Sequence, residues 1–227
     1  MLNNPTVEKL RDMKLKVMAQ MLSNPDTSLK ELTFEERIGI MVEKEWISKK
    51  NSRIKRLLAS AALGLNACIE DIDYTVDRKI DKTTIHSLSS CSYIEQKLNI
   101  VISGKTGSGK TYIACALGNA ACRHGYTARY YRMPELLLEI EESKAENRYA
   151  RFMSSLQNTK LLILDDIGLK SYTLEESRDI LEIAESRYNT ASTILSGQVS
   201  HTKWYDLFPD PTIADAILDR EIGRAHV

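Results

Sequence analysis

A glycine-rich segment at residues 104–111 reads GKTGSGKT, and the spacing G-x-x-x-x-G-K-T is that of a phosphate-binding loop. Its glycines let the backbone curl so that N–H groups point at phosphate oxygens, and a following helix N-terminus adds partial positive charge. Lys110 is expected to reach the β- and γ-phosphates, and Thr111 to offer its hydroxyl to Mg²⁺. The residues predicted to hold the nucleotide are Gly104, Lys105, Thr106, Gly107, Ser108, Gly109, Lys110 and Thr111. The segment therefore predicts a site for ATP and Mg²⁺.

Two aspartates follow the apolar run LLIL at residues 161–164. A buried strand here would place Asp165 at its carboxyl end, where a carboxylate can organise the Mg²⁺ shell. Asp166 is an additional acid that can polarise a water against the γ-phosphate. The alternative is that Asp166 only caps the turn at Ile167 and Gly168. Because a phosphate loop lies upstream, we expect the catalytic role.

A further polar group is predicted beside the phosphates. The segment TARYYR lies between the loop and LLILDD, which suits NTPases that insert a strand between their two phosphate-site strands. STILSGQ is then the next strand, and its tip at residues 196–198 would lie beside the γ-phosphate. Gln198 is the candidate sensor there, although an ordinary loop glutamine remains the alternative.

These residues need a framework of strands and helices to position them, and the chain from residue 97 onward supplies the pattern. Strands are predicted at LNIVIS, ARYY, LLIL and STILS. Helices are predicted at YIACALGNAACRH, which Gly125 ends, after Pro134, and over residues 174–188. Strands that alternate with helices indicate an α/β fold with a parallel sheet flanked by helices.

The first part of the chain is helical and rich in charge. An apolar helical face runs from Val7 to Leu22, and Asn24, Pro25 and Asp26 then break the pattern. Thr33 with Glu36 forms a predicted capping box before a helix that runs to Leu57 and Leu58.

Basic residues recur at helical spacing on the second of these helices. They are Lys49, Lys50, Arg53 and Arg56. Such a face suits sequence-independent contacts to DNA phosphates, and a solvated helix face is the alternative. Trp46 is expected in the core rather than as a base-stacking platform.

Composition sets wider limits. The 227 residues contain 31 basic and 31 acidic side chains, so global charge says nothing about partners. No apolar run approaches a membrane span and no signal core is present, which predicts a cytoplasmic protein. The cysteines are Cys68, Cys91, Cys115 and Cys122. They show no metal-ligand spacing and are expected to be reduced packing residues.

Several segments together resemble the IstB-like ATPases, the helper proteins of a bacterial insertion-sequence group, and more distantly the DnaC helicase loaders. The resemblance covers about residue 5 to Arg220. It rests on LTFEERI, EKEW, ACIEDIDY, ISGKTGSGKTYIACALG, LLILDDIGL, RDILEIAESRY, STILSGQ and DPTIADAILDR.

The resemblance implies an AAA+ P-loop NTPase domain behind a small helical DNA-binding domain. It implies ATP-dependent self-association on double-stranded DNA and delivery of that DNA to a partner transposase, whose activity the protein stimulates. Lys110, Thr111 and Asp165 would then carry nucleotide and metal, and Asp166 would support hydrolysis. Arg220 falls where the family has an arginine that reaches the nucleotide of a neighbouring subunit.

Two rival functions compete with that of the transposition helper. One is a helicase loader that uses ATP as a switch, against which the LTFEERI, EKEW and ACIEDIDY segments argue. The other is a P-loop small-molecule kinase, which would need an acceptor site and an Arg-rich lid that the sequence does not show. A neighbouring transposase gene would favour the first function.

The predicted domains are residues 1–96, helical, and 97–220, the ATPase. Beyond Arg220 the family pattern stops, and residues 221–227, EIGRAHV, look like translated sequencing-adapter sequence. We therefore expect this tail to be foreign and the last strand of the sheet to be missing. The phosphate-loop strand would then be an edge with unpaired backbone groups.

Overall fold

The structure is a computed structural model that describes residues 5–24, 31–74, 81–222 and 225–226. The chain forms two compact units, residues 1–56 and residues 57–227. The phosphate loop and both aspartates belong to the second unit, and the basic residues of the predicted DNA face belong to the first.

The first unit is helical, with α1 (Pro5–Asp12), α2 (Lys16–Ser23) and most of α3 (Phe34–Ala61). The capping box at the start of α3 is confirmed, because Thr33 N donates to Glu36 Oε2 at 2.8 Å and Glu36 N donates to Thr33 Oγ1 at 3.3 Å. The apolar pattern after Val7 forms two helices rather than one, since the backbone turns at Lys14 with φ of 60°. Pro25 and Asp26 of the predicted break lie outside the described residues.

A buried carboxylate joins α2 to α3. The N-cap residue of α2 is Leu15, whose apolar side chain cannot accept a hydrogen bond from the helix. Glu45 of α3, only 5% exposed, accepts hydrogen bonds from Val17 N at 2.7 Å and Met18 N at 3.1 Å. These first-turn N–H groups have no partner inside their own helix, and a negative charge is favourable at a helix N-terminus. Glu45 therefore fixes how the two helices pack.

The second unit is built on a parallel sheet with the strand order β2-β3-β4-β1-β5. The strands are β1 (Asn99–Ser103), β2 (Ala128–Arg132), β3 (Leu161–Ile167), β4 (Ser192–Gly197) and β5 (Ala225–His226). A strand does lie between β1, which precedes the phosphate loop, and β3, which carries the aspartates, but it is β4 and not the TARYYR strand to which the sequence pointed. The TARYYR strand, β2, lies at the edge of the sheet beyond β3.

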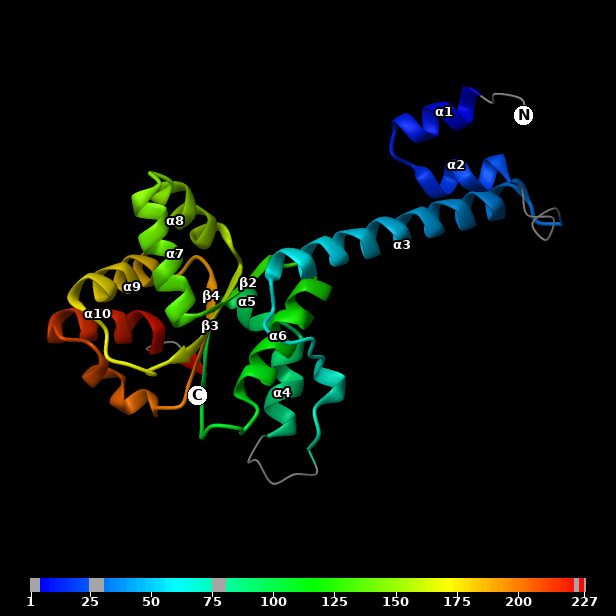
Figure 1. Cartoon of the computed structure of the whole chain (residues 1–227). Coiled ribbons are helices and arrows are strands. Elements are labelled where there is room, and N and C mark those ends of the chain that lie inside the picture. Colours follow the sequence, from blue (N-terminus) through cyan, green and yellow to red (C-terminus); the bar gives the residue numbers. More distant parts are fainter. Residues whose placement is uncertain (1–4, 25–30, 75–80, 223–224, 227) are drawn as a thin grey trace. The chain divides into compact units, whose positions relative to one another are not determined.

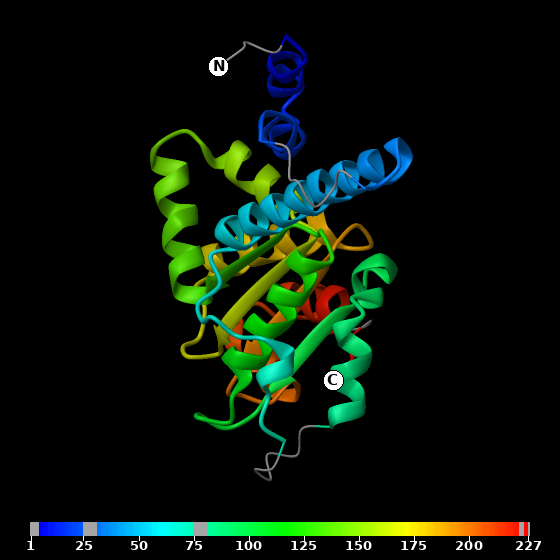
Figure 2. The ribbon, with the colours of Figure 1, turned by 90° about the vertical axis from the view of Figure 1, so that its right-hand side faces the viewer.

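Helices cover both faces of the sheet, as Figure 1 shows. One face carries η2 (Ile69–Asp71), α4 (Lys82–Ser89), α5 (Ser92–Gln96) and α6 (Lys110–Arg123). The other face carries α7 (Met133–Ala145), α8 (Tyr149–Asn158), α9 (Leu174–Arg187), η3 (His201–Leu207) and α10 (Pro211–Ile222). Figure 2 looks onto the first face, with α6 lying over the strands.

The central residues of β1, β3 and β4 are apolar because both faces of these strands are buried. Successive residues point to opposite faces, so Ile163 and Ile194 join the core under α6 while Leu162 and Leu195 join the core under α7 to α10. Helix α6 approaches the sheet closely at Gly118, where a Cβ would lie 2.7 Å from Ile163 Cδ1. The absence of a side chain at Gly118 therefore lets the helix that begins at the phosphate loop pack closely on the sheet.

The boundary between the units differs from the predicted one after residue 96. The structure places it after Arg56. Ala61, Ile72, Ile85 and Ile94 are buried in the same core cluster as β1 and α6. The helical character predicted for residues 1–96 did not show that this segment packs on the sheet of the second unit.

The C-terminal residues also differ from the expectation. Helix α10 continues past Arg220 to Ile222, and Glu221 is buried with 6% exposure. The short strand β5 pairs in parallel with Asn99 and Ile100 of β1. The expected unpaired edge of the phosphate-loop strand is therefore covered at these two residues.

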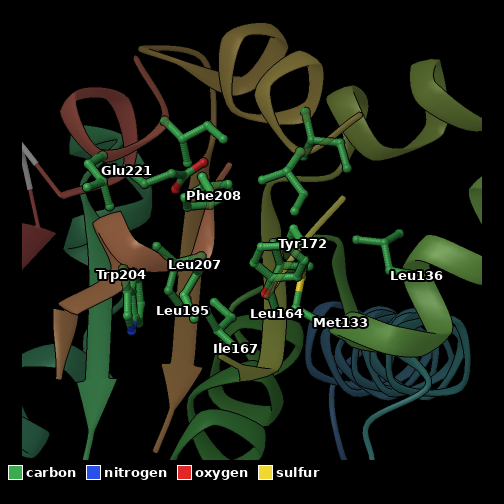
Figure 3. Close-up of a pocket in the computed structure, with 14 residues that line it drawn as sticks. Met133, Leu136, Leu164, Ile167, Tyr172, Leu195, Trp204, Leu207, Phe208 and Glu221 are labelled. Atoms are coloured by element: carbon green, nitrogen blue, oxygen red, sulfur yellow. The ribbon is translucent and has the colours of Figure 1, made fainter. Parts of the chain in front are cut away.

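An apolar cavity of about 40 Å³ lies within the core under α7 to α10 (Figure 3). Leu164, Leu195, Trp204 and Phe208 are among the residues that line it, and Glu221 lies at its margin. None of the lining residues comes from the phosphate loop. The cavity is therefore separate from the predicted nucleotide site.

All four cysteines are free thiols, and Cys91, Cys115 and Cys122 are buried. This agrees with their predicted role as packing residues, although Cys68 is only partly buried. Among the helices described, none combines the length and the apolar character that a membrane span needs.

Candidate nucleotide site

The loop between β1 and α6 has the backbone that its glycines allow. Gly107 and Gly109 have φ of 78° and 93°, in the left-handed region that glycine favours. A Cβ at Gly104 would lie 3.0 Å from Ser108 Oγ, so a larger residue would crowd the turn. Helix α6 begins immediately after Gly109. The loop therefore leads its backbone directly into a helix N-terminus, which suits a phosphate.

Lys110, the first residue of α6, folds back over the loop. Its Nζ donates a hydrogen bond to the carbonyl oxygen of Lys105 at 2.9 Å. This contact holds the ammonium group against the backbone of the loop. The predicted phosphate-binding cation is thus positioned by the loop itself.

Thr111 and Asp165 meet across the junction of α6 and β3. Thr111 Oγ1 donates to Asp165 Oδ2 at 2.6 Å, and Asp166 N donates to Asp165 Oδ1 at 2.9 Å. Burial acts to raise the pKa of the Asp165 carboxyl. The hydrogen bonds that it accepts, of which the one from Thr111 has the largest effect, outweigh burial and lower the pKa. The side chain is therefore a carboxylate at neutral pH. The predicted pair of metal-site residues is brought together.

The chemistry of this pair fits Mg²⁺. Both groups present oxygen atoms, which Mg²⁺ prefers, and the ion is commonly held by one or two protein groups together with substrate phosphates. Thr111 and Asp165 are the residues that would hold it here.

Asp166 is placed beside Asp165 by an irregularity in β3. The pairing with β4 shifts register between Leu164 and Ile167, and Asp166 has φ of 61°. A bulge of this kind redirects a side chain at the end of a strand. The Asp166 side chain is 22% exposed, and its Oδ2 accepts a hydrogen bond from Arg132 Nε at 2.7 Å. The structure thus places Asp166 next to the metal-site residues but pairs it with a cation.

Gln198 directly follows β4 and lies against the phosphate loop. Thr106 Oγ1 donates to Gln198 Oε1 at 2.7 Å, and Gly104 N donates to Gly197 O at 3.4 Å. The central position of β4 in the sheet brings its tip to the loop.

Arg220 is remote from this loop in the same chain. Its backbone oxygen accepts a hydrogen bond from Asn99 Nδ2 at 3.3 Å. Asn99 is the first residue of β1, whereas the phosphate loop follows the last residue of that strand. Five residues of strand separate the two positions by roughly 16 Å. The guanidinium group donates to Glu185 Oε1 at 3.0 Å and to Ala216 O at 2.8 Å. Arg220 therefore does not join the nucleotide site of its own chain.

The four predicted DNA-binding residues are exposed on α3. They are Lys49, Lys50, Arg53 and Arg56. Trp46 on the same helix is 55% exposed, so the expectation that it is a core residue is wrong. Lys50 Nζ lies 4.9 Å from the centroid of the Trp46 ring, so the cation covers the indole.

Two residues of the site were missed in the sequence. Tyr130 and Arg132 of β2 lie beside β3, with Tyr130 paired to Ile163 and Arg132 paired to Asp165. Tyr130 OH donates to Asp165 Oδ2 at 3.0 Å. Strand alternation in TARYYR indicates that residues 130 and 132 share a face. It does not indicate which strand lies next to them.

Comparison with known proteins identifies the family. The model of the IstB-like ATP-binding protein family matches residues 8–227. An insertion sequence ATP-binding protein of Sinorhizobium fredii is 36% identical over 230 residues, which cover 100% of this chain and 93% of that protein.

Solved structures support the fold. The DnaC helicase loader aligns with a TM-score of 0.60 and 19% identity, over 69% of this chain and 94% of that one. The AMPPCP-bound DnaA of Aquifex aeolicus aligns with a TM-score of 0.60 and 20% identity, over 68% of this chain and 48% of that one. These identities support only the fold, which is that of AAA+ P-loop proteins. The match to the family model over nearly the whole chain establishes that this protein belongs to the IstB-like ATP-binding protein family.

Proposed function

We propose that the protein binds and hydrolyses ATP with Mg²⁺, and that ATP controls its assembly on double-stranded DNA, where it recruits and stimulates a partner transposase. The observation that carries the ATPase part is the 2.6 Å contact between Thr111 and Asp165 at the phosphate loop, with Asp166 beside it. This arrangement joins a phosphate cradle, a metal-binding pair and a candidate base.

Each group has a role that follows from its place. The loop N–H groups and Lys110 bind the phosphates, while Thr111 and Asp165 hold the metal. Bound Mg²⁺ would neutralise charge on the β- and γ-phosphates. Asp166 orients a water and accepts its proton once its carboxylate is free of Arg132. Gln198, anchored to Thr106, is placed to sense the terminal phosphate.

The DNA and transposase parts of the proposal have different support. The exposed basic face of α3 supports contact with DNA phosphates. Likeness over the whole chain to an insertion sequence ATP-binding protein supports a role in transposition and, with it, a transposase as the partner. A DnaC-like helicase loader is the alternative, but at 19% identity that likeness concerns the fold. Co-purification with the neighbouring transposase rather than with a replicative helicase would favour the transposition role.

The substitution Asp166→Asn tests the catalytic assignment. The amide keeps the shape of the side chain but cannot accept a proton, so we expect ATP to bind with unchanged affinity and turnover to fall by about 100-fold or more. Lys110→Ala is the matched control, because it removes the cation of the cradle and should abolish productive binding. Binding of a fluorescent ATP analogue and release of phosphate measure the two effects. Normal turnover in Asp166→Asn would move the catalytic role to another residue.

A further inference from the structure

We propose that Tyr130 is a positioning residue of the metal site, whose hydroxyl holds the Asp165 carboxylate in the orientation that Mg²⁺ binding needs. The proposal deepens the ATPase function proposed above and rests on it. It assigns a role to a residue of the edge strand β2, outside the phosphate loop and the LLILDD segment.

The hydrogen bonds around Asp165 show why a separate donor is needed. Its Oδ2 accepts from both Thr111 and Tyr130, at 2.6 Å and 3.0 Å, and its Oδ1 accepts from the backbone. The torsion that turns a carboxylate is broad, so bonded partners decide its orientation. Thr111 must also offer its oxygen to the metal. Tyr130 is a side-chain donor to Asp165 that has no other assigned role in the site.

The tyrosine is itself held in place. Its side chain lies in the core under α6, and the residue is 9% exposed. Gly64, three residues beyond the end of α3, faces the ring, and a Cβ there would lie 2.9 Å from Tyr130 Cε1 and Cζ. Glycine at this position therefore lets the ring sit where its hydroxyl reaches Asp165.

These contacts form a supporting shell for a metal ligand. Hydrogen-bond partners of metal-binding groups fix the orientation of those groups, and their removal typically costs 10–100-fold in metal affinity. A residue that only fills space in the core would affect folding but would leave the metal requirement unchanged. Metal affinity therefore separates the two roles.

The test is Tyr130→Phe, which keeps the ring and removes the hydroxyl. A fluorescent ATP analogue is titrated in EDTA and then with increasing Mg²⁺. We expect the variant to bind the analogue as the wild type does in EDTA. The Mg²⁺ concentration that gives half of its full effect on analogue binding should be about tenfold higher than for the wild type. Mn²⁺ should reduce the increase in metal requirement, since oxygen and nitrogen sites usually bind Mn²⁺ more tightly than Mg²⁺. Tyr131→Phe is the matched control, because that side chain lies in the core on the opposite face.

Gly64→Ala provides a second, independent variant. The added methyl should displace the ring and raise the Mg²⁺ requirement although the hydroxyl remains. This variant carries the test if Tyr130→Phe does not fold, which thermal melting would show. If the wild-type protein binds ATP without any effect of Mg²⁺, the proposed function fails. If wild-type binding depends on Mg²⁺ but both variants match it, the role of Tyr130 is overturned.

Discussion

Arg132 Nε lies 2.7 Å from Asp166 Oδ2, where the ends of β2 and β3 meet. The pair joins the proposed catalytic base to a cation on the neighbouring strand. The hydrogen bond to Asp166 raises the pKa of Arg132, so the guanidinium group keeps its charge. The Arg132 side chain is half-exposed, and exposed ion pairs contribute little stability. The contact can therefore open without a large cost.

We expect Arg132→Ala to raise ATP hydrolysis in the absence of DNA several-fold, because the Asp166 carboxylate would be free to orient water. ATP affinity should not change, since Arg132 does not contact the loop. Steady-state phosphate release measures the effect. Glu135→Gln is the control, because Glu135 Oε1 lies 3.7 Å from Arg132 Nη1 and so pairs with a different nitrogen of the guanidinium group. A fall in hydrolysis would instead show that Arg132 assists the reaction.

Replacing the four basic residues of α3 by glutamine should weaken binding to DNA of any sequence. These residues are Lys49, Lys50, Arg53 and Arg56. Each phosphate contact that is lost should flatten the dependence of log K on log salt by about one unit. Fluorescence anisotropy at several salt concentrations measures the slope. Lys9 and Lys16, replaced together, serve as a control for lost charge on other helices. An unaltered slope would show that the basic face is only solvated.

We expect Arg220 to act on the nucleotide of a neighbouring subunit, as the family resemblance implies, since it lies too far from the loop of its own chain to act there. Arg220→Ala should lower turnover while ATP affinity stays within about twofold. Mixing this variant with Asp166→Asn should restore part of the activity, since mixed assemblies contain a junction with both intact residues. Arg123→Ala, which breaks an exposed ion pair with Glu70, is the control. Mixtures that stay inactive would contradict action between subunits.

Glu221 should make stability depend on pH. Burial, partly offset by Arg187, raises the pKa of its carboxyl to about 7. Between the unfolded pKa of about 4.5 and this value, the folded state keeps a proton that the unfolded state has lost, so the free energy of unfolding falls as pH rises.

Glu221→Gln should remove this dependence and raise the free energy of unfolding at pH 8 by up to about 3 kcal/mol. The amide oxygen can still accept from Asn99 Nδ2, which lies 3.0 Å from the carboxylate in the unsubstituted protein. Urea unfolding at pH 4.5, 6 and 8 gives the slope, with exposed Glu185→Gln as the control. Parallel curves for wild type and Glu221→Gln would refute the prediction.

The sequence by itself determined the local parts of the protein. The glycine pattern of the loop, the apolar runs before Asp165 and Gln198, and the capping box at Thr33 each depend on neighbours within a few residues. Their identity alone limits the backbone, so the strands, the helix after the loop and the phosphate site followed from spacing. The family resemblance followed from the same segments.

Only the tertiary structure decided which distant segments meet. Tyr130 and Arg132 reach Asp165 and Asp166 because β2 pairs with β3, and Glu45 caps α2 from another helix. The exposure of Trp46 and the burial of Ala61, Ile72, Ile85 and Ile94 in the second unit likewise depend on packing partners far away in sequence. Apolar spacing shows that a residue has a favourable face to bury. It does not show which other segment that face packs against, because the packing partner depends on the summed contacts of the whole fold.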